Sequence, residues 1–410
     1  MKRTSVPKVL ALSAVFFLAG FMVFAAGTVI QFWSWNNEGS YPNVHQDAQA
    51  RFEKNHPGVT VNRQYISYTE YMVKLKAVLS GEEAPDVFQI PWAGEYTELA
   101  RSGKILPLTE HLKKGFPTFF PNIMKAISVD GEAWAVPLDL NTLQIAYNKT
   151  MFASMGLSVP RTKDELIAVA KKLADNGKFG VALGTKDLWA GADVFFAQVA
   201  YTDPSHTRMA KADAGQIPWN SPDFLKAVQA VADYVKQGVI APGANSMDAF
   251  VGAKNLFVQQ QAAMFYPVGN FVTGGITKDV GDSFEWSLFP WPALAKGGDA
   301  LPTGGVAEMF VVSKDSKNTD LALEFLRDMT NDAGKEILVK NDFIPSSTYK
   351  GTVAMSPLYK NMLDAQSKSQ SRVVYNTVVY TAIMNGMQGV YGATLTPEAF
   401  IDSLVKAANK

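Results

Sequence analysis

The sequence contains no cysteine, which excludes disulfides, thiolate nucleophiles, thiolate metal sites and lipid-modified cysteines. Histidine is also scarce: the four histidines lack the spacing of metal ligands, and we expect each to be solvated or to cap a helix. The chain also has no net charge, because 38 basic residues balance 38 acidic ones. Such a chain has no long-range field to attract nucleic acid. We therefore expect no metal, no cofactor and no nucleic-acid partner.

Motifs of the common enzyme and nucleotide-binding classes are missing as well. The chain has no GxSxG elbow, no HExxH, no P-loop and no GxGxxG after an expected strand. One enzymatic alternative stays open, because two carboxylates that face one bond are enough to hydrolyse a glycoside. The acids that come into question are Glu38, Asp86, Glu95 and Asp139.

The first residues do carry a recognisable signal. Three basic residues among the first eight precede an uncharged apolar stretch at 9–24, and small residues follow at 25–27. We expect residues 1–27 to be a signal peptide that is cleaved near residues 25–27. An uncleaved membrane anchor is the alternative, because the uncharged run continues through residues 29 and 30. Without a cysteine for a lipid anchor, the periplasm of a two-membraned bacterium is the expected location.

The rest of the chain alternates helical and strand-like patterns, which is typical of α/β folds. Apolar residues recur every three or four positions in 44–52, 72–79, 166–173, 225–235, 321–329 and 400–404, and strand-like runs occupy 28–32, 59–65 and 86–90. Thr162 and Thr396 stand where helix N-caps are expected. At 410 residues the length favours two or three domains, and we expect two lobes.

Two of the expected strands end at a tryptophan that is followed by a polar turn. They are WSWNNEG at 33–39 and PWAGEY at 91–96. Open α/β sheets bind their ligands at the carboxyl ends of strands. Aromatic faces stack on the C–H faces of sugar rings, while amides and carboxylates bind hydroxyl groups. We interpret Trp35 as a ligand platform and Trp33, on the same face of the strand, as core packing beneath it.

The order of the segments resembles the family 1 extracellular solute-binding proteins, the sugar receptors of ABC importers that include the maltose-binding proteins. The pieces that carry the resemblance are APDVFQIPW (84–92), LARSGKILPLTEHL (99–112), GEAWAVPLDLNTLQIAYNKTMFASMGLSVPRTKDEL (131–166), QQQAAMFYPVG (259–269), GGVAEMFVVSKDSKNTDLALEFLRDMT (304–330) and FIPSS (343–347). The resemblance implies an α/β fold of the type II periplasmic-binding-protein kind, with two discontinuous lobes that close like a hinge. It places the lobes at 28–138 with 303–345 and at 139–302 with 346–410, and the crossings near 137–140, 301–303 and 344–347.

By the same resemblance, the ligand-binding positions are Trp35, Asn36, Asn37, Glu38, Trp92, Glu95, Asp139, Asn141, Trp189, Tyr266, Asn270, Gly304 and Gly305. Asp139 is the foremost polar candidate, because a crossing lies within reach of both lobes; the alternative is a hinge carboxylate that caps local N–H groups. The turn PVG at 267–269 departs from the asparagine-glycine-tryptophan type that is frequent in the family, which puts a stacking ring there in doubt.

The resemblance implies a monomeric periplasmic receptor that captures a mono- or oligosaccharide and delivers it to the membrane permease of an ABC transporter. It implies no catalysis. Two alternatives stay open: a secreted glycoside hydrolase, and the same fold with a polyamine or another non-sugar solute as ligand.

Overall fold

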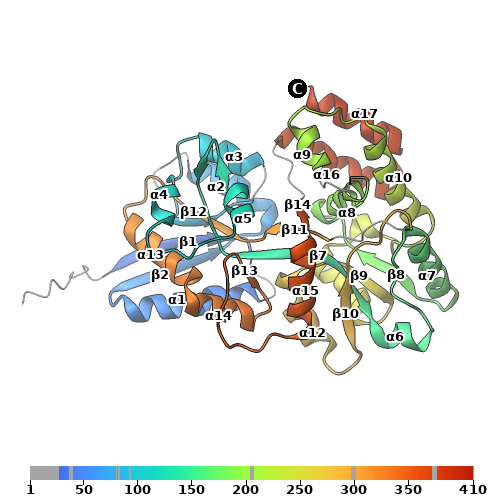
Figure 1. Cartoon of the computed structure of the whole chain (residues 1–410), viewed down its shortest axis with the longest axis horizontal. Coiled ribbons are helices and arrows are strands. Elements are labelled where there is room, and N and C mark those ends of the chain that lie inside the picture. The colour runs from blue at the N-terminus through green and yellow to red at the C-terminus, as the bar shows by residue number, and fades with distance from the viewer. Residues whose placement is uncertain are drawn as a thin grey trace, which may run out of the picture.

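The computed structural model describes residues 27–36, 40–79, 81, 84–91, 94–203, 207–296, 302–371 and 376–409. The described residues form two lobes, each built around its own sheet (Figure 1). We call the part around the five-stranded sheet the first lobe and the part around the seven-stranded sheet the second lobe. The expected signal peptide, except Gly27, and the expected site residues Asn37, Glu38 and Trp92 lie outside the described residues.

The sheet of the first lobe has the strand order β2-β1-β3-β12-β6, in which β1, β2 and β3 are parallel and β12 is antiparallel. The strands are β1 (Thr28–Ser34), β2 (Val59–Tyr65), β3 (Val87–Gln89), β6 (Val136–Pro137) and β12 (Met309–Val312), with a hairpin of β4 (Ser128–Val129) and β5 (Glu132–Ala133). The helices are α1 (Tyr41–Asn55), α2 (Tyr68–Val78), α3 (Gly94–Arg101), α4 (Thr109–Leu112), α5 (Pro121–Ala126), α13 (Thr319–Thr330) and α14 (Asp332–Lys340).

The second lobe is built around the long strand β7, which pairs with β9, β10, β11 and β13. The strands are β7 (Asp139–Asn148), β8 (Phe179–Leu183), β9 (Ala262–Val268), β10 (Trp286–Phe289), β11 (Thr303–Val306), β13 (Ile344–Pro345) and β14 (Gln370–Ser371). The helices are α6 (Lys149–Ser154), α7 (Lys163–Asp175), α8 (Trp189–Ala200), α9 (Arg208–Asp213), α10 (Pro222–Lys236), α11 (Lys254–Val258), α12 (Asn270–Val280), α15 (Pro357–Lys368), α16 (Thr377–Tyr391) and α17 (Pro397–Ala408). A 3-10 turn (Ala244–Ser246) and a π-helix (Ala249–Ala253) precede α11.

The expected strands and helix starts are confirmed. The strand-like runs at 28–32, 59–65 and 86–90 are β1, β2 and β3. Both expected N-caps are formed, because Thr162 Oγ1 accepts the N–H of Glu165 and Thr396 Oγ1 accepts the N–H of Ala399, each at 3.2 Å. Each bond satisfies a backbone donor that has no partner inside the helix. Local sequence thus determines where these elements begin.

The chain passes between the lobes in three segments that are hydrogen-bonded to one another. Leu138 is central: its N–H donates to the carbonyl of Glu308 at 2.8 Å, and its carbonyl accepts the N–H of Ser346 at 3.2 Å. The segments at 137–140 and 344–347 are two of the three. The remaining crossing lies at 306–309 rather than 301–303, because Thr303–Val306 pairs with β7 as strand β11 of the second sheet. The expected lobe boundary at 302/303 therefore falls short of the sheet boundary by a few residues.

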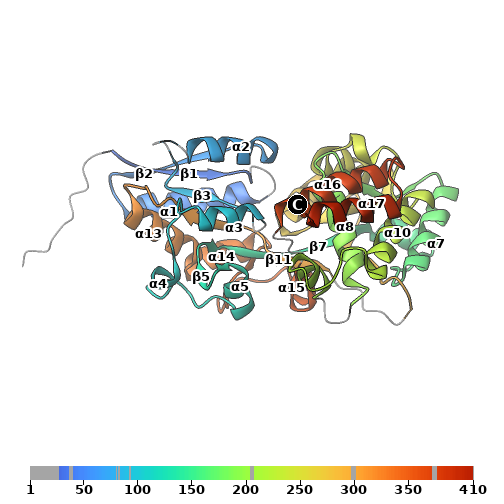
Figure 2. The same ribbon diagram turned by 90° about the horizontal axis from the view of Figure 1, so that it is seen from above.

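The lobes also touch on both sides of the boundary between them (Figure 2). Near the crossings, Ser40 at the start of α1 lies against Gly274 in α12, where a Cβ on the glycine would stand 2.4 Å from Ser40 Oγ. On the other side, Thr377 of α16 donates to Glu98 of α3 at 2.8 Å. None of the described helices has the length and apolar character that crossing a bilayer requires.

Candidate ligand-binding site

Trp35 follows β1, which runs from the far side of the first lobe toward the second (Figure 1). Its half-buried ring stands edge-on to the ring of Tyr71, with 5.0 Å between the centroids and 77° between the planes. Tyr71 is itself fixed, because its hydroxyl donates to the carbonyl of Gln89 at 2.7 Å, and burial raises the pKa of Tyr71 well above its usual value. A rigid tyrosine thus supports the expected platform.

Gln89, the last residue of β3, holds the backbone of the same loop. Its Oε1 accepts hydrogen bonds from Ser34 Oγ at 2.7 Å and from the N–H of Trp35 at 3.2 Å. Ser34 Oγ in turn accepts the N–H of Asn36 at 3.0 Å. Because the N–H of Trp35 can only donate, the orientation of the Gln89 amide is fixed. Its buried Nε2 has no hydrogen-bond partner among the described residues.

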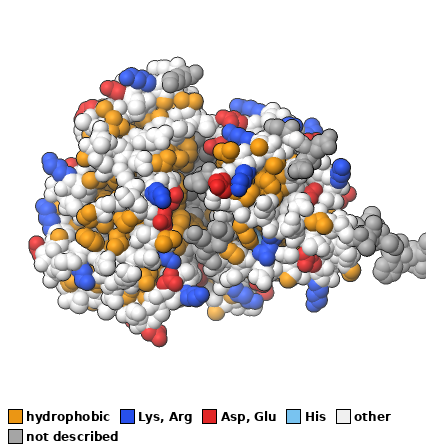
Figure 3. Space-filling view, turned by 180° about the vertical axis from the view of Figure 1, so that it is seen from behind, with side chains coloured by type: hydrophobic (Ala, Val, Ile, Leu, Met, Phe, Trp, Pro, Cys, Tyr) orange, Lys and Arg blue, Asp and Glu red, His pale blue; other side chains and the backbone are white. Residues whose placement is uncertain are grey.

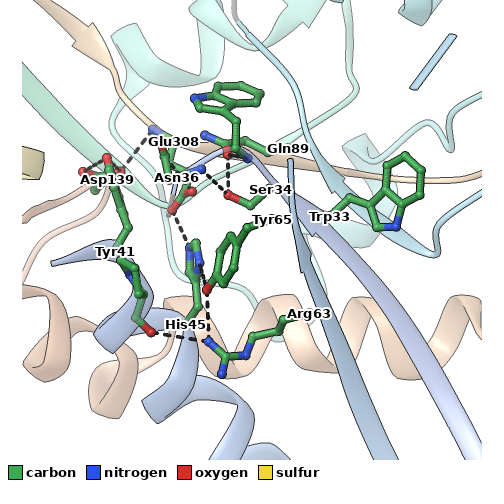
Figure 4. A network of polar contacts seen from close by, with 12 residues as sticks. Trp33, Ser34, Asn36, Tyr41, His45, Arg63, Tyr65, Gln89, Asp139 and Glu308 are labelled. Atoms are coloured by element: carbon green, nitrogen blue, oxygen red, sulfur yellow. Dashed lines mark hydrogen bonds and ion pairs between the residues drawn. The ribbon is translucent and has the colours of Figure 1, made fainter. Parts of the chain in front are cut away.

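Glu308 connects Asn36 to a buried polar chain (Figure 4). Its side chain is fully buried; Oε1 accepts from Asn36 Nδ2 at 2.9 Å, and Oε2 lies 2.9 Å from His45 Nε2. His45 Nδ1 lies 3.2 Å from the hydroxyl of Tyr65, which accepts a hydrogen bond from Arg63 at 3.0 Å. The chain of polar contacts therefore runs from Asn36, after β1, to the half-buried Arg63 in β2.

Asp139 is fully buried where the two lobes meet, and protein groups satisfy it. It accepts hydrogen bonds from the hydroxyl of Tyr41 at 3.0 Å, from Asn270 Nδ2 at 2.9 Å and from the N–H of Glu308 at 3.1 Å. Burial, and next the negative charge of Glu308, raise the pKa of Asp139 well above its usual value. In this structure Asp139 makes the contacts of the hinge carboxylate that the sequence left as the alternative.

In the second lobe, three half-buried aromatic rings contact one another in sequence. Trp189, the first residue of α8, stacks on Phe250 at 5.9 Å and 30°, and Phe250 stands edge-on to Phe271 at 5.5 Å. Phe271 directly follows Asn270, which binds Asp139. In the space-filling view the surface is hollowed along the boundary between the lobes, with apolar side chains on both sides (Figure 3). We call Trp189, Phe250 and Phe271 the aromatic row.

Two expected site residues in the second lobe are bound by their own lobe. Tyr266 is fully buried, and its hydroxyl donates to the carboxylate of Asp193, which also accepts from Thr303 Oγ1 at 2.8 Å. Asn270 is also fully buried, with Nδ2 shared between Asp139 and the carbonyl of Leu140. In this conformation both side chains are buried and stabilise the second lobe at its boundary through hydrogen bonds within that lobe.

The other expected residues are more dispersed. Asn141 and Gly305 are paired neighbours in β7 and β11, and Asn141 is buried. A Cβ on Gly304 would stand 2.7 Å from Ser369 Cβ, so close packing alone requires a glycine there. Glu95 lies in the first turn of α3 and is half-buried. Of the expected set, the structure brings Asn36, Asp139 and Asn270 into one network with Glu308.

Sequence reasoning missed Gln89, Glu308, Tyr41 and His45 as parts of this network. The expectation that each histidine is solvated or a helix cap is wrong for His45, which is fully buried. One available signal was its spacing, because Tyr41 and His45 are four residues apart on the helical face that also buries Val44. No comparable signal marks Glu308, which precedes a short apolar strand.

The chain is similar to known proteins in sequence and in fold. A family model described as bacterial extracellular solute-binding protein matches residues 35–336. The chain is 25% identical to the multiple sugar-binding protein of Streptococcus mutans over 291 residues, 68% of this chain and 66% of that protein. It is 27% identical to the sn-glycerol-3-phosphate-binding periplasmic protein UgpB of Rhizobium meliloti over 231 residues, 52% of each. The chain thus spans about half to two thirds of the length of these curated relatives.

A solved structure extends the similarity in fold over almost the whole chain. A chitin oligosaccharide binding protein superposes with a TM-score of 0.82 at 21% identity, and the match covers 94% of this chain and 99% of that one. The two-lobed type II fold expected from the sequence is therefore confirmed.

Proposed function

The chain belongs to the bacterial extracellular solute-binding protein family, and on that premise we propose that it is an exported receptor for a mono- or oligosaccharide. The ligand binds between the lobes, the lobes close around it, and the closed form delivers it to the membrane permease of an ABC transporter. A ligand closes the lobes only if it binds the closed state more tightly than the open one, so both lobes have to contact it. The receptor acts as a monomer in the periplasm, after cleavage near residues 25–27.

The observation that carries this proposal is the presence of half-buried aromatic rings on both sides of the lobe boundary. Trp35 and Asn36 lie at the end of β1 in the first lobe, and Trp189 begins the aromatic row in the second. Half-buried rings in both lobes, next to amide groups, suit the apolar faces and the hydroxyl edges of a sugar. Asn37, Glu38, Trp92 and Glu95 complete the proposed first-lobe contacts.

Asp139 and Asn270 take a different part in the proposal. Both belong to the network at the crossings, with Asp139 bonded to Tyr41 of the first lobe and Asn270 at the start of α12 in the second. The Tyr41–Asp139 bond links the lobes directly, and Asn270 holds Asp139 from within the second lobe, so both residues act on ligand binding through the hinge. Tyr266, Asn141, Gly304 and Gly305 support the second-lobe wall.

A binding screen tests the proposal. The purified mature protein is heated with neutral mono- and oligosaccharides, sugar alcohols, spermidine and sn-glycerol 3-phosphate. A ligand at a hundred times its dissociation constant adds about 2.7 kcal/mol to the free energy of unfolding, which a thermal shift detects. We expect a shift with at least one neutral saccharide. A thermal shift with spermidine alone would reject the proposal that the ligand is a saccharide.

Two tryptophan variants then locate the site. We expect Trp35→Ala and Trp189→Ala each to weaken saccharide binding by about tenfold or more, because each removes a stacking face. Trp286→Ala is the matched control, since Trp286 is equally half-buried but lies on β10. Equal affinity of Trp35→Ala and the wild type would remove Trp35 from the site.

The glycoside hydrolase alternative is tested in the same samples by product analysis. Asp86 is engaged away from the proposed site, by the N–H of Gln31 at 2.8 Å and by Ser316 Oγ at 2.5 Å, at the opposite end of β3 from Gln89. We expect stoichiometric binding without cleavage of the sugar. Turnover that Asp139→Asn abolishes would overturn the receptor proposal.

A further inference from the structure

We infer that Glu308, held by His45, orients the Asn36 side chain so that this subsite accepts a hydrogen-bond donor of the ligand and disfavours an anionic group. The inference rests on the proposed function, because it takes the loop after β1 as a ligand contact. It goes further, since it names the chemistry that the subsite selects and assigns a positioning residue that the loop itself does not contain.

The Asn36 amide has one orientation that satisfies its hydrogen bonds. Asn36 Nδ2 donates to Glu308 Oε1 at 2.9 Å. A carboxylate oxygen accepts but does not donate, so a flipped amide would set two acceptors against each other. The Nδ2 end therefore faces Glu308, and Oδ1 is the end left for a ligand. Among the described residues, no group donates to Asn36 Oδ1.

Glu308 is held rigidly by its other partners. It is 0% exposed, and its other oxygen lies 2.9 Å from His45 Nε2, so that nitrogen carries the proton. His45 Nδ1 then accepts the hydroxyl hydrogen of Tyr65, which receives a bond from Arg63. Each group in the chain has one consistent donor and acceptor role. The carboxylate is thus held before any ligand arrives, which lowers the cost of ordering Asn36 on binding.

The charge around Asn36 disfavours an anionic ligand group. The carboxylate of Glu308 contacts Asn36 directly, and the carboxyl group of Asp139 accepts the backbone N–H of Glu308. The nearest cationic side chain along the network is Arg63, three hydrogen bonds beyond Glu308. A phosphate or carboxylate placed against Asn36 Oδ1 would meet an acceptor and a negative charge. A hydroxyl or an ammonium group would donate to it.

An exchange of the amide and the carboxylate between positions 36 and 308 tests the hydrogen bond between Asn36 and Glu308. Asn36→Asp sets a carboxylate against Glu308, and we expect the affinity for the saccharide found in the screen to fall about tenfold or more. Adding Glu308→Gln to that variant restores a hydrogen bond with the donor and acceptor exchanged, while a carboxylate oxygen of the substituted side chain still faces the ligand. We expect the double variant to recover to within about threefold of the wild type.

Single variants separate positioning from folding. Glu308→Gln alone presents both a donor and an acceptor to Asn36, so the amide orientation is no longer imposed and we expect the affinity to fall about threefold. Asn62→Asp is the matched control, because Asn62 Nδ2 makes a similar 2.8 Å bond to Gln31 on the exposed side of the same lobe. Melting temperatures of all variants confirm folding. A double variant as weak as Asn36→Asp would overturn the inference.

The ligand panel distinguishes this inference from the function on which it rests. Raffinose and N,N′-diacetylchitobiose supply hydroxyl donors, spermidine supplies ammonium donors, and sn-glycerol 3-phosphate supplies an anion. If spermidine alone binds and follows the exchange, the sugar proposal fails while this inference stands. If sn-glycerol 3-phosphate binds and is insensitive to Asn36→Asp, the inference fails while a receptor function stands. If no probe binds, both fail.

Discussion

The two sides of the lobe boundary are held in different ways. In the first lobe the loop after β1 is fixed by hydrogen bonds to buried polar groups, chiefly Gln89 and Glu308. In the second lobe Trp189 stacks on Phe250, which in turn contacts Phe271. Hydrogen bonds impose direction on a side chain, whereas packed rings impose position and exclude water. One side is thus suited to select the ligand's polar groups and the other to cover its apolar face.

Asp193 is the strongest test of this comparison, because it is a buried carboxylate within the second lobe. It accepts hydrogen bonds from Tyr266 and Thr303. We expect Asp193→Ala to lower the free energy of unfolding by about 3 kcal/mol, since two buried hydroxyls lose a charged acceptor. Asp193→Asn, which keeps one acceptor, should lose about half as much. Urea unfolding measures both, and equal losses in the two variants would show that cavity formation dominates.

Phe250→Ala removes the middle ring of the aromatic row, which leaves Trp189 without its stacking partner. We expect a loss of about 2 kcal/mol in the free energy of unfolding, together with weaker saccharide binding. Phe179→Ala is the control, because Phe179 is 41% exposed at the start of β8 and contributes less burial. Unfolding and calorimetric binding measurements check both. Unchanged affinity in Phe250→Ala would show that packing does not position Trp189.

Gly274→Ala probes where the two sides meet. Its Cβ would stand 2.4 Å from Ser40 Oγ but 3.9 Å from Ser40 Cβ, so rotation of the Ser40 hydroxyl relieves the overlap without a movement of α12. We expect a cost of about 1 kcal/mol in the free energy of unfolding, which urea unfolding measures. Gly275→Ala, with no atom within 4 Å of the added Cβ, should be neutral or slightly stabilising. Adding Ser40→Ala should relieve much of the effect; a double variant as perturbed as Gly274→Ala would contradict this interpretation.

The smallest expected effect is a trend with pH at Asp139. Its pKa is raised by burial and by Glu308, so the folded protein holds the proton more tightly than the unfolded chain does. Its stabilising contribution is fully present below the unfolded pKa of about 4, and it is lost as the pH rises through the higher folded pKa. Between pH values of about 4 and 7 we expect the wild type to lose more stability than Asp139→Asn. Parallel unfolding curves would contradict the raised pKa.

Local signals in the sequence predict much of the fold. The alternation in 59–65 and the caps at Thr162 and Thr396 determine their elements without help from distant residues. Strand β11 was not predictable in this way, because TGGV has neither β-branched alternation nor length, and it is a strand only through its pairing with β7.

The candidate site shows the same difference between residues with a local signal and residues that depend on distant partners. The end of β1 could be proposed as a ligand contact from the sequence, because tryptophan followed by amides is a local pattern. The partner of Asn36 could not, since Glu308 is 272 residues away and reaches it only where the 306–309 crossing passes the start of β7. Likewise, nothing in the sequence around Asp139 distinguishes a ligand contact from a buried bond to Asn270.

The position of β12 between β3 and β6 has a consequence for biogenesis. A chain that emerges from its N-terminus first, whether from a ribosome or from an export channel, presents β1, β2 and β3 early. It cannot attach β6 to them until residue 312 of the 410 has emerged, because β12 has to lie between them. By then most of the second lobe has also emerged. The two lobes therefore mature together, so that an interrupted chain contains no finished first lobe.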